Sequence, residues 1–471
     1  MLFNYFKTAL RNITKNKANS FLNISGLAIG LAIAGLIFLW VEDEMNFDQF
    51  NAKKDQLYFV MVNQKYDSYV FTHWSTPGVM APAMKAEIPG VANTCRVSED
   101  QSRLLFTIGD KSMYASGRYT EASLFQMFTL PFVQGNASSA FRQLYSLVIT
   151  EKTAHKFFGN DPNVVGKTVR VDNKQDYVIS GVIKDLPENS SLQFEWLAPF
   201  EIYYQQSPWA HEWGNCCIST YIELKPGTDP ANVDKQLYGF IQKRVPASIS
   251  HPFLSSMNDW HLRGQFVDGK RTGGGQIQYV HLFSLIAWII LFIACINFMN
   301  LSTARSEKRA REVGVRKVLG AQRSKLVFQF IGEAMLMSFL AGIAAVMLIL
   351  LVIPEFNVLV QKDLKVNPGD PLHLSVFFTI TIICGLVAGS YPAFYLSSFN
   401  PVSVLKGFKL KTGSAAFIRK TLVVMQFSVS IMLIISTIII YKQIHHVKNR
   451  QLGFNKDNLI EIDIQGELQN R

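Results

Sequence analysis

Charged residues are scarce in this chain. Asp, Glu, Lys and Arg make up only 17% of its 471 residues, whereas soluble proteins usually contain about 25%. Hydrophobic residues make up 49%, which is too low for a chain buried entirely in lipid. The composition therefore argues against both an ordinary soluble protein and a purely membrane-embedded one. It indicates membrane spans combined with a sizeable soluble domain.

The motifs of several enzyme classes are also missing. No G-x-x-x-x-G-K-[ST] loop is present, so the chain lacks the lysine and backbone amides that hold ATP phosphates. His211-Glu212 begins a zinc-protease pattern, but Asn215 stands where H-E-x-x-H requires its second histidine. No G-x-S-x-G elbow occurs, and no basic cluster lies beside stacking aromatics. We therefore expect no catalytic residue, no metal site, no cofactor bound by this chain and no nucleic-acid partner.

Cysteine is rare, with five residues. Cys295 and Cys384 lie in apolar segments, where cysteine packs as a small hydrophobic side chain. The other three are Cys95 and the neighbouring pair Cys216 and Cys217. Two interpretations remain open for them: three free thiols, or a disulfide from Cys95 to one member of the pair.

Long apolar runs, by contrast, are plentiful. A bilayer crossing needs about 20 predominantly apolar residues. Retained membrane spans, rather than buried core helices or a cleaved signal peptide, are predicted at residues 21–41, 281–303, 326–353, 374–396 and 422–441. We expect Pro392 to kink or end the fourth span.

One acid, Glu333, falls inside a predicted span. A buried carboxylate in a membrane is costly without a partner, which makes a functional role the first interpretation. The alternative is that Glu333 lies within about one turn of the interface and reaches water.

The placement of charge predicts the topology. The net charge is +11, and the basic excess falls in the N-terminal segment and in loops 304–325 and 397–421. The stretch 42–280 is slightly acidic. Because short basic loops remain cytoplasmic, we expect the N-terminus inside and residues 42–280 outside. Net positive charge here marks the inner face of a membrane.

The regions outside the spans differ in character. Residues 1–20 have apolar side chains at helical spacing with basic residues opposite, which predicts an amphipathic helix on the cytoplasmic face or, alternatively, a frayed tail. Residues 42–280 alternate short strands and helices, which predicts an α+β domain outside the membrane. The expected fold class is thus an α-helical membrane protein with about five transmembrane helices and a large α+β extracytoplasmic domain. Residues 442–471 end in a strand pattern and are expected to begin a second such domain.

The loop between the second and third spans carries the most specific motif. It reads Arg-Glu-Val-Gly-Val-Arg-Lys-Val-Leu-Gly-Ala over residues 311–321. Helix formers followed by a glycine predict a short helix that Gly320 ends in the left-handed conformation. Such a helix could dock in a groove of a soluble partner; the alternative is a solvated basic loop.

This motif resembles that of the FtsX/MacB-like ABC permeases, in which the loop reads similarly to E-x-G-[VI]-R-K-x-[LIF]-G-A. The resemblance extends over essentially the whole chain in several blocks. These are residues 75–96, 125–128, 149–159, 181–190, 296–305, 329–334, 391–393 and 401–406.

The resemblance implies a permease subunit in a bacterial inner membrane, driven by a separate cytoplasmic ABC ATPase that binds the ATP and Mg. It implies coupling to that ATPase through the loop residues Arg311, Glu312, Gly314, Val315, Arg316, Lys317, Leu319, Gly320 and Ala321. A second permease half, from a homodimer or from a missing C-terminal repeat, would complete the assembly. The expected function is export or extraction of a hydrophobic or peptide-like substrate, such as an antimicrobial peptide, a macrolide-like drug or a lipoprotein. The alternative is a sensor that moves an outer enzyme without transporting a solute.

Overall fold

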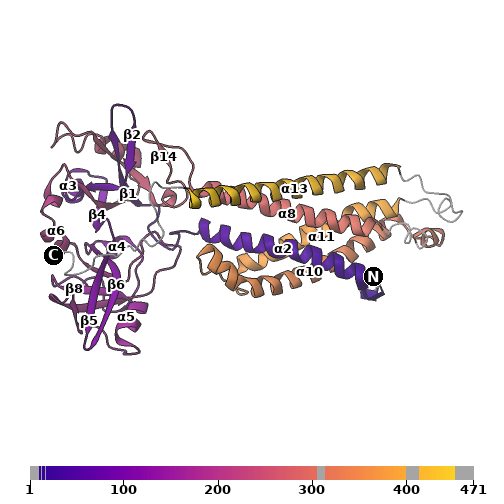
Figure 1. The fold of residues 1–471 in the computed structure, drawn as a ribbon, viewed down its shortest axis with the longest axis horizontal. Helices are drawn as coiled ribbons and strands as arrows, with labels where there is room; N and C mark the ends of the chain where they lie inside the picture. Colours follow the sequence, from indigo (N-terminus) through magenta and orange to yellow (C-terminus); the bar gives the residue numbers. More distant parts are fainter. Residues whose placement is uncertain (1–9, 12, 16, 305–312, 399–412, 451–471) are drawn as a thin grey trace. The chain divides into compact units, whose positions relative to one another are not determined.

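A computed structural model describes residues 10–11, 13–15, 17–304, 313–398 and 413–450 (Figure 1). It divides the chain into two compact units. The helical unit falls within residues 1–42 and 281–460, and the sheet unit is built on residues 43–280.

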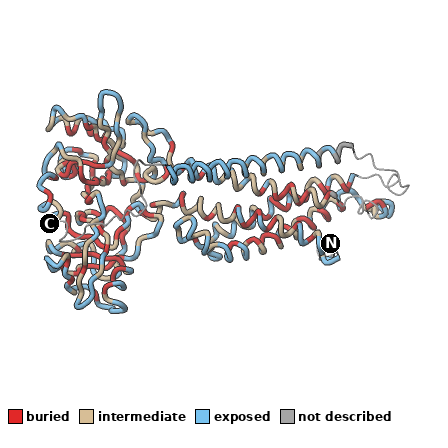
Figure 2. The backbone as a smooth tube through the Cα atoms, viewed as in Figure 1, coloured by how far each residue is buried: buried red, intermediate tan, exposed pale blue. Residues whose placement is uncertain are grey.

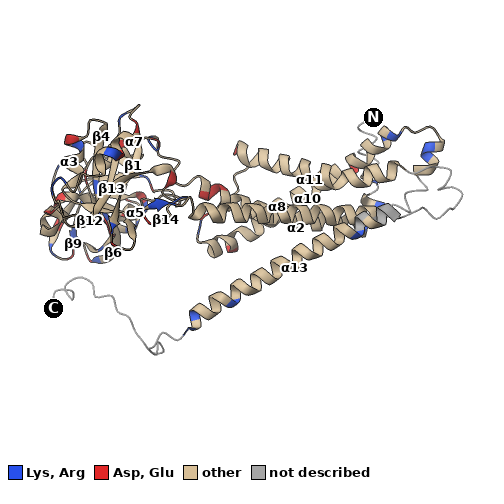
Figure 3. Cartoon of the chain, turned by 90° about the horizontal axis from the view of Figure 1, so that it is seen from above, with Lys and Arg blue, Asp and Glu red and all other residues tan. Residues whose placement is uncertain are grey.

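The described residues contain five helices that are long and apolar enough to cross a membrane, judged by length and composition. They are α2 (Lys17–Met45), α8 (Gln276–Ala304), α10 (Arg323–Val360), α11 (Pro371–Ser397) and α13 (Gly413–Asn449). Charged residues concentrate near the ends of these helices (Figure 3).

Each helix is longer than the apolar segment from which we predicted it. Helical hydrogen bonding continues into the polar residues at both ends, whereas the prediction counted only the apolar stretch. The largest difference is in α13, which begins at Gly413, inside the segment 397–421 that we expected to be a loop. Pro392 lies within α11 and does not end it, because the helix continues to Ser397.

Small residues bring the long helices together. A Cβ at Gly30 of α2 would lie 2.7 Å from the Ala294 Cβ of α8, and one at Gly389 of α11 would lie 2.6 Å from the Ala334 Cβ of α10. These approaches enclose an apolar core shared by α2, α8, α10 and α11 (Figure 2). The apolar window of α13, in contrast, has no buried residue.

The sheet unit alternates strands and short helices. Its N-terminal half contains β1 (Leu57–Lys65), β2 (Val70–His73), β3 (Ser75–Pro77), α3 (Met80–Glu87), β4 (Val91–Ser98), β5 (Ser102–Ile108), β6 (Lys111–Thr120), α4 (Leu124–Met127), β7 (Phe132–Gln134), β8 (Ser146–Thr150) and α5 (Glu151–Phe158). Its C-terminal half contains β9 (Thr168–Val171), β10 (Gln175–Ile183), β11 (Trp196–Pro199), α6 (Phe200–Gln206), η1 (Pro208–His211), β12 (Cys216–Leu224), α7 (Pro230–Leu237), β13 (Ser250–Ser256), η2 (Met257–Asp259), β14 (Phe266–Val267) and β15 (Lys270–Arg271).

The main sheet joins its strands in the order β11-β8-β10-β9-β5-β6-β4-β12-β1-β13, and β11 also pairs with β6. That extra parallel pairing closes six strands into a ring, around a core that includes Phe106, Ile149, Ile179 and Trp196. A second core lies between strands β1 and β12 and helices α3 and α7. The mixed α+β character predicted for this region is therefore present.

Local signals in the sequence explain several of these elements. Thr150 caps α5 by accepting a hydrogen bond from the Thr153 amide at 3.3 Å, and Gly159 ends it with φ of 65°. Asp229 caps α7 by accepting a hydrogen bond from the Ala231 amide at 3.0 Å, and after Leu237 the chain continues in turns. The glycine-rich stretch 269–275 includes strand β15.

All five cysteines are free thiols. Cys95 of β4 lies opposite Tyr221 of β12, so Cys217 is four residues further along that strand. Four residues span about 14 Å in a strand, and a disulfide needs Cα atoms within about 7 Å. The register therefore excludes the disulfide that the sequence left open.

Candidate coupling site

Residues 313–318 form a short helix, which we call the loop helix, and its C-terminus has the geometry expected from Gly320. The Ala321 amide donates to the Arg316 carbonyl and the Gly320 amide donates to the Lys317 carbonyl, each at 3.0 Å. Gly320 has φ of 88°. These two bonds with a left-handed glycine constitute a Schellman cap, which satisfies carbonyls that the helix end would leave free. Arg311 and Glu312 lie outside the described residues.

One face of the loop helix packs on the long helices. Val313 is 2% exposed and Gly314 is also buried. Val313 joins an apolar cluster with Leu326 and Phe330 of α10 and Ala393 and Leu396 of α11. The sequence identified residues 311–321 as a motif, but only the packing on α10 and α11 shows that Val313 is the valine that faces inward.

Two basic side chains fasten the loop helix to its neighbours. Arg316 Nη1 donates to Gln329 Oε1 of α10 at 2.8 Å, and Lys317 Nζ donates to the Ser397 carbonyl of α11 at 2.6 Å. Partial burial, and then the nearby charge of Arg323, lower the pKa of Lys317. The loop helix is thus attached to both α10 and α11.

The opposite face of the loop helix is apolar and exposed. The exposed fractions are 47% for Val315, 64% for Val318 and 81% for Leu319. Three adjacent apolar side chains on the surface of a basic segment form a patch suited to a protein partner. We call these three residues the exposed face.

Glu333 is linked to this arrangement. Its side chain is 5% exposed, and Gln329 Nε2 donates to its Oε1 at 3.3 Å. The chain of contacts therefore runs from Arg316 through Gln329 to Glu333. This burial argues against the alternative in which Glu333 reaches water, and a functional role for it stays a prediction.

The pocket around Glu333 gathers residues from four helices. Pro392 of α11, Asn23 of α2 and Ser302 of α8 line it together with Glu333. Asn23 is 5% exposed, and its Oδ1 has no hydrogen-bond partner among the described residues. Sequence analysis missed Asn23, although an amide inside an apolar span is a readable signal.

A second polar group lies where α2 ends and α11 begins. Potential ligand atoms of Glu42, Asp370 and His373 lie within 4.8 Å of one another, a spacing that suits a metal ion. However, His373 Nδ1 accepts the Asn367 amide at 3.0 Å, so Nε2 carries the hydrogen and donates it to Glu42 Oε2 at 2.9 Å. In this tautomer the imidazole has no lone pair left for a metal.

Comparisons with known proteins agree with this architecture. Residues 20–238 match the MacB-like periplasmic core domain, and residues 284–401 match the FtsX-like permease C-terminal domain. The chain is 26% identical over 315 residues to the macrolide export ATP-binding/permease protein MacB of Salmonella paratyphi A, covering 64% of this chain and 45% of that protein. It is 25% identical over 330 residues to MacB of Escherichia coli strain K12, covering 67% and 47%. The chain thus spans about half the length of the curated relatives it matches.

Two solved structures are also similar to the chain. One is a domain of a permease protein from Porphyromonas gingivalis, with 26% identity, a TM-score of 0.39, and coverage of 44% of this chain and 91% of that one. The other is the periplasmic region of MacB from Actinobacillus actinomycetemcomitans, with 15% identity, a TM-score of 0.33, and coverage of 44% and 90%.

Five membrane-length helices and a large α+β domain define a multi-pass membrane protein with a domain of the periplasmic type. The two matched domains, in this order along the chain, make the assignment more specific. The chain belongs to the FtsX/MacB-like family of ABC transporter permeases.

Proposed function

We propose that this chain is the permease subunit of an ABC transporter, and that it converts ATP hydrolysis by a separate cytoplasmic ATPase into motion of its outer domain. ATP and Mg would be bound by the ATPase. The motion would export or extract a hydrophobic or peptide-like substrate, such as an antimicrobial peptide, a macrolide-like drug or a lipoprotein.

The two-faced loop helix is the observation that carries this proposal. One face is fixed to α10 and α11 through Val313, Arg316 and Lys317, while the exposed face is free to bind a partner. A partner that moves this helix would push on both long helices, because the attachment includes apolar packing and charged hydrogen bonds. The nine loop residues named from the sequence are proposed to couple the ATPase to the long helices: the exposed ones by contact with the partner, and Arg316 and Lys317 by their attachment to α10 and α11.

The proposed orientation has the N-terminus and the loop helix in the cytoplasm of a bacterium, and residues 43–280 beyond the inner membrane. The basic excess of the loops supports it. Helices α2 and α8 have no internal proline, unlike α10 and α11, which contain Pro354 and Pro392. Uninterrupted helices are the stiffer route by which motion would reach the sheet unit.

The test is association with an ATPase. The detergent-solubilised chain is mixed in turn with each stand-alone ABC ATPase subunit of its source organism, and binding and ATP hydrolysis are measured. We expect one ATPase to bind, and Leu319→Asp to weaken binding by about tenfold or more. A charge on the exposed face must be desolvated in the complex, while the fold of the free chain is little affected.

Val267→Asp is the matched control, because Val267 is also apolar and 56% exposed but lies in the sheet unit. It should leave ATPase binding unchanged. Equal binding by the parent and by Leu319→Asp would remove the coupling assignment. Once an ATPase is identified, release of substrate in step with hydrolysis would support transport, and activation of an outer enzyme without such release would favour the sensor alternative.

A further inference from the structure

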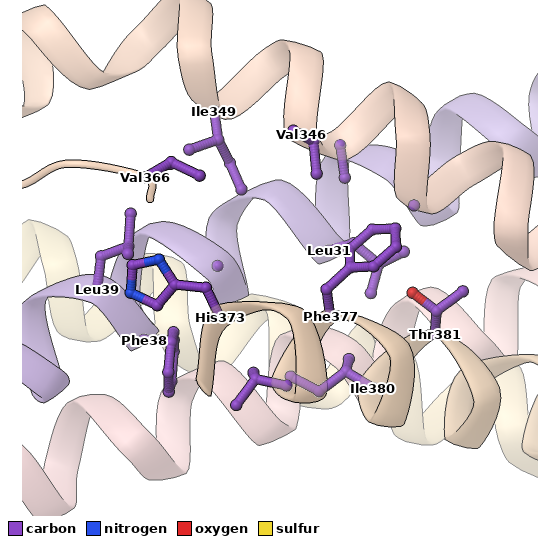
Figure 4. Close-up of a pocket in the computed structure, with 14 residues that line it drawn as sticks. Leu31, Phe38, Leu39, Val346, Ile349, Val366, His373, Phe377, Ile380 and Thr381 are labelled. Carbon is purple, nitrogen blue, oxygen red and sulfur yellow. The ribbon is translucent and has the colours of Figure 1, made fainter. Parts of the chain in front are cut away.

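An apolar slot lies between α2, α10 and α11 (Figure 4). His373 lies at one end and Thr381 at the other, with Leu31, Phe377 and Ile380 between them. The slot follows α2 from Leu31 to Leu39 and α11 from His373 to Thr381. Eight residues of helix rise about 12 Å, so the cavity is an elongated channel parallel to the helices.

Small residues line part of the slot. They are Gly35 of α2 and Gly342 and Ala345 of α10. A Cβ at Gly342 would lie 3.0 Å from Thr381 Oγ1 and 3.1 Å from Phe377. Apart from His373 and Thr381, its lining residues are apolar or glycine. This chemistry suits a hydrocarbon chain better than water.

One end of the slot is acidic. His373 lines the slot and donates to Glu42, and the Asp370 carboxylate lies within 4.8 Å of both. The group thus combines two carboxyl side chains with one imidazole, whose Nδ1 accepts the Asn367 amide. The side chains of Glu42 and His373 are 16% and 13% exposed, so charges on these groups are only partly screened by solvent.

The described basic residues of the adjoining loop have other contacts. Lys362 Nζ lies 6.0 Å from the centroid of the Trp40 ring, and Lys365 Nζ pairs with Asp363 at 2.5 Å. Asp370 Oδ1 accepts the Leu372 amide at 2.8 Å as the cap of α11, which leaves its second oxygen available to a ligand.

We propose that this slot binds a cationic amphiphile, with one hydrocarbon chain between α2, α10 and α11 and an ammonium head against Glu42 and Asp370. The apolar slot accounts for the chain, and the acidic group at its end accounts for the head. This site does not depend on ATPase coupling, and its test does not use ATP.

The test uses the full chain in lipid nanodiscs. The probe is dodecylamine with a photoreactive diazirine near its methyl end, and labelled peptides are mapped by mass spectrometry. We expect saturable labelling on residues 31–35, 342–346 and 377–381, which lie at the end of the slot away from the acidic group. Unlabelled dodecylamine should compete, while dodecanol and dodecanoic acid should compete at least tenfold less well, because neither provides a positive head.

Two pairs of variants separate the parts of the site. Glu42→Gln should weaken competition by dodecylamine about tenfold, because the amide keeps an acceptor oxygen but loses the negative charge that attracts the ammonium. The control is Glu355→Gln, which replaces an exposed acid of α10 and should leave competition unchanged. Val346→Phe should fill the slot and abolish labelling, whereas Met347→Phe, one residue along and 64% exposed, should preserve it. Thermal unfolding of each variant checks that the fold is retained.

Several outcomes would overturn the proposal. Labelling spread evenly over the exposed faces of the helices would show partition into lipid rather than a site. Equal competition by dodecanol would exclude recognition of the cation. Stoichiometric Zn²⁺ binding that requires His373 and displaces the probe would assign the acidic group to a metal instead.

Discussion

Burial determines the chemistry of Cys95. It is fully buried on β4, and its sulfur lies 3.3 Å from Thr120 Oγ1. Loss of solvation, and then the charge of Glu121, raise the pKa of the Cys95 thiol to about 12. Since the thiolate is the reactive form, this cysteine should be inert at neutral pH.

We therefore predict that Cys95 resists alkylation in the folded chain. At pH 8 a thiol with a pKa of about 12 is about 0.01% ionised, against about a quarter for an unperturbed cysteine. Iodoacetamide should modify it at least a thousandfold more slowly than in denaturant, as followed by mass spectrometry. Below a pH of about 8 the raised pKa does not change the free energy of unfolding. At higher pH the thiol ionises in the unfolded chain first, so the free energy of unfolding should fall. Alkylation at equal rates in both states would contradict this account.

At the scale of elements, α10 and α11 pack closely against each other. Gly385 and Gly389 lie four residues apart on α11, and a Cβ at either would lie 2.6 Å from an atom of α10. Two small residues four positions apart allow close approach of membrane helices, where packing rather than the hydrophobic effect holds them together. The loop helix rests on this pair, so its position depends on their spacing.

We predict that Gly389→Leu forces α10 and α11 apart. Overpacking of this kind costs about 1–3 kcal/mol, and the midpoint of thermal unfolding in detergent should fall. Gly332→Leu on α10 is the control, because a Cβ there meets no atom within 4 Å. If both variants unfolded at the same temperature, the tight contact would not contribute to stability.

At the scale of the whole molecule, the charge pattern makes a topological prediction. A cysteine introduced by Asp110→Cys in the exposed hairpin of the sheet unit should react with a membrane-impermeant maleimide on intact spheroplasts. One introduced by Lys325→Cys beside the loop helix should react only after the membrane is opened. The parent chain provides the baseline, since its five cysteines are buried or partly buried. Labelling of both positions from the same side would be incompatible with the proposed orientation.

Local patterns in the sequence were enough to predict the spans, the α+β class of the outer region and the glycine cap of the loop helix. Each depends on residues close together in the chain: a run of apolar side chains, the alternation of short elements, or a glycine after a helical stretch. The length of α13 was predicted less well, because helix ends depend on hydrogen bonds and packing that periodicity does not reveal.

The sequence alone thus determined which segments are apolar enough to enter a membrane and which carry the positive charge, because hydropathy and charge are properties of each segment. Only the tertiary structure decided that Arg316 contacts Gln329, that Cys95 lies opposite Tyr221, and that an acidic group lies at one end of an apolar slot. Those contacts join residues 13 to more than 300 positions apart, and helix packing and strand register, not local preference, bring such residues together.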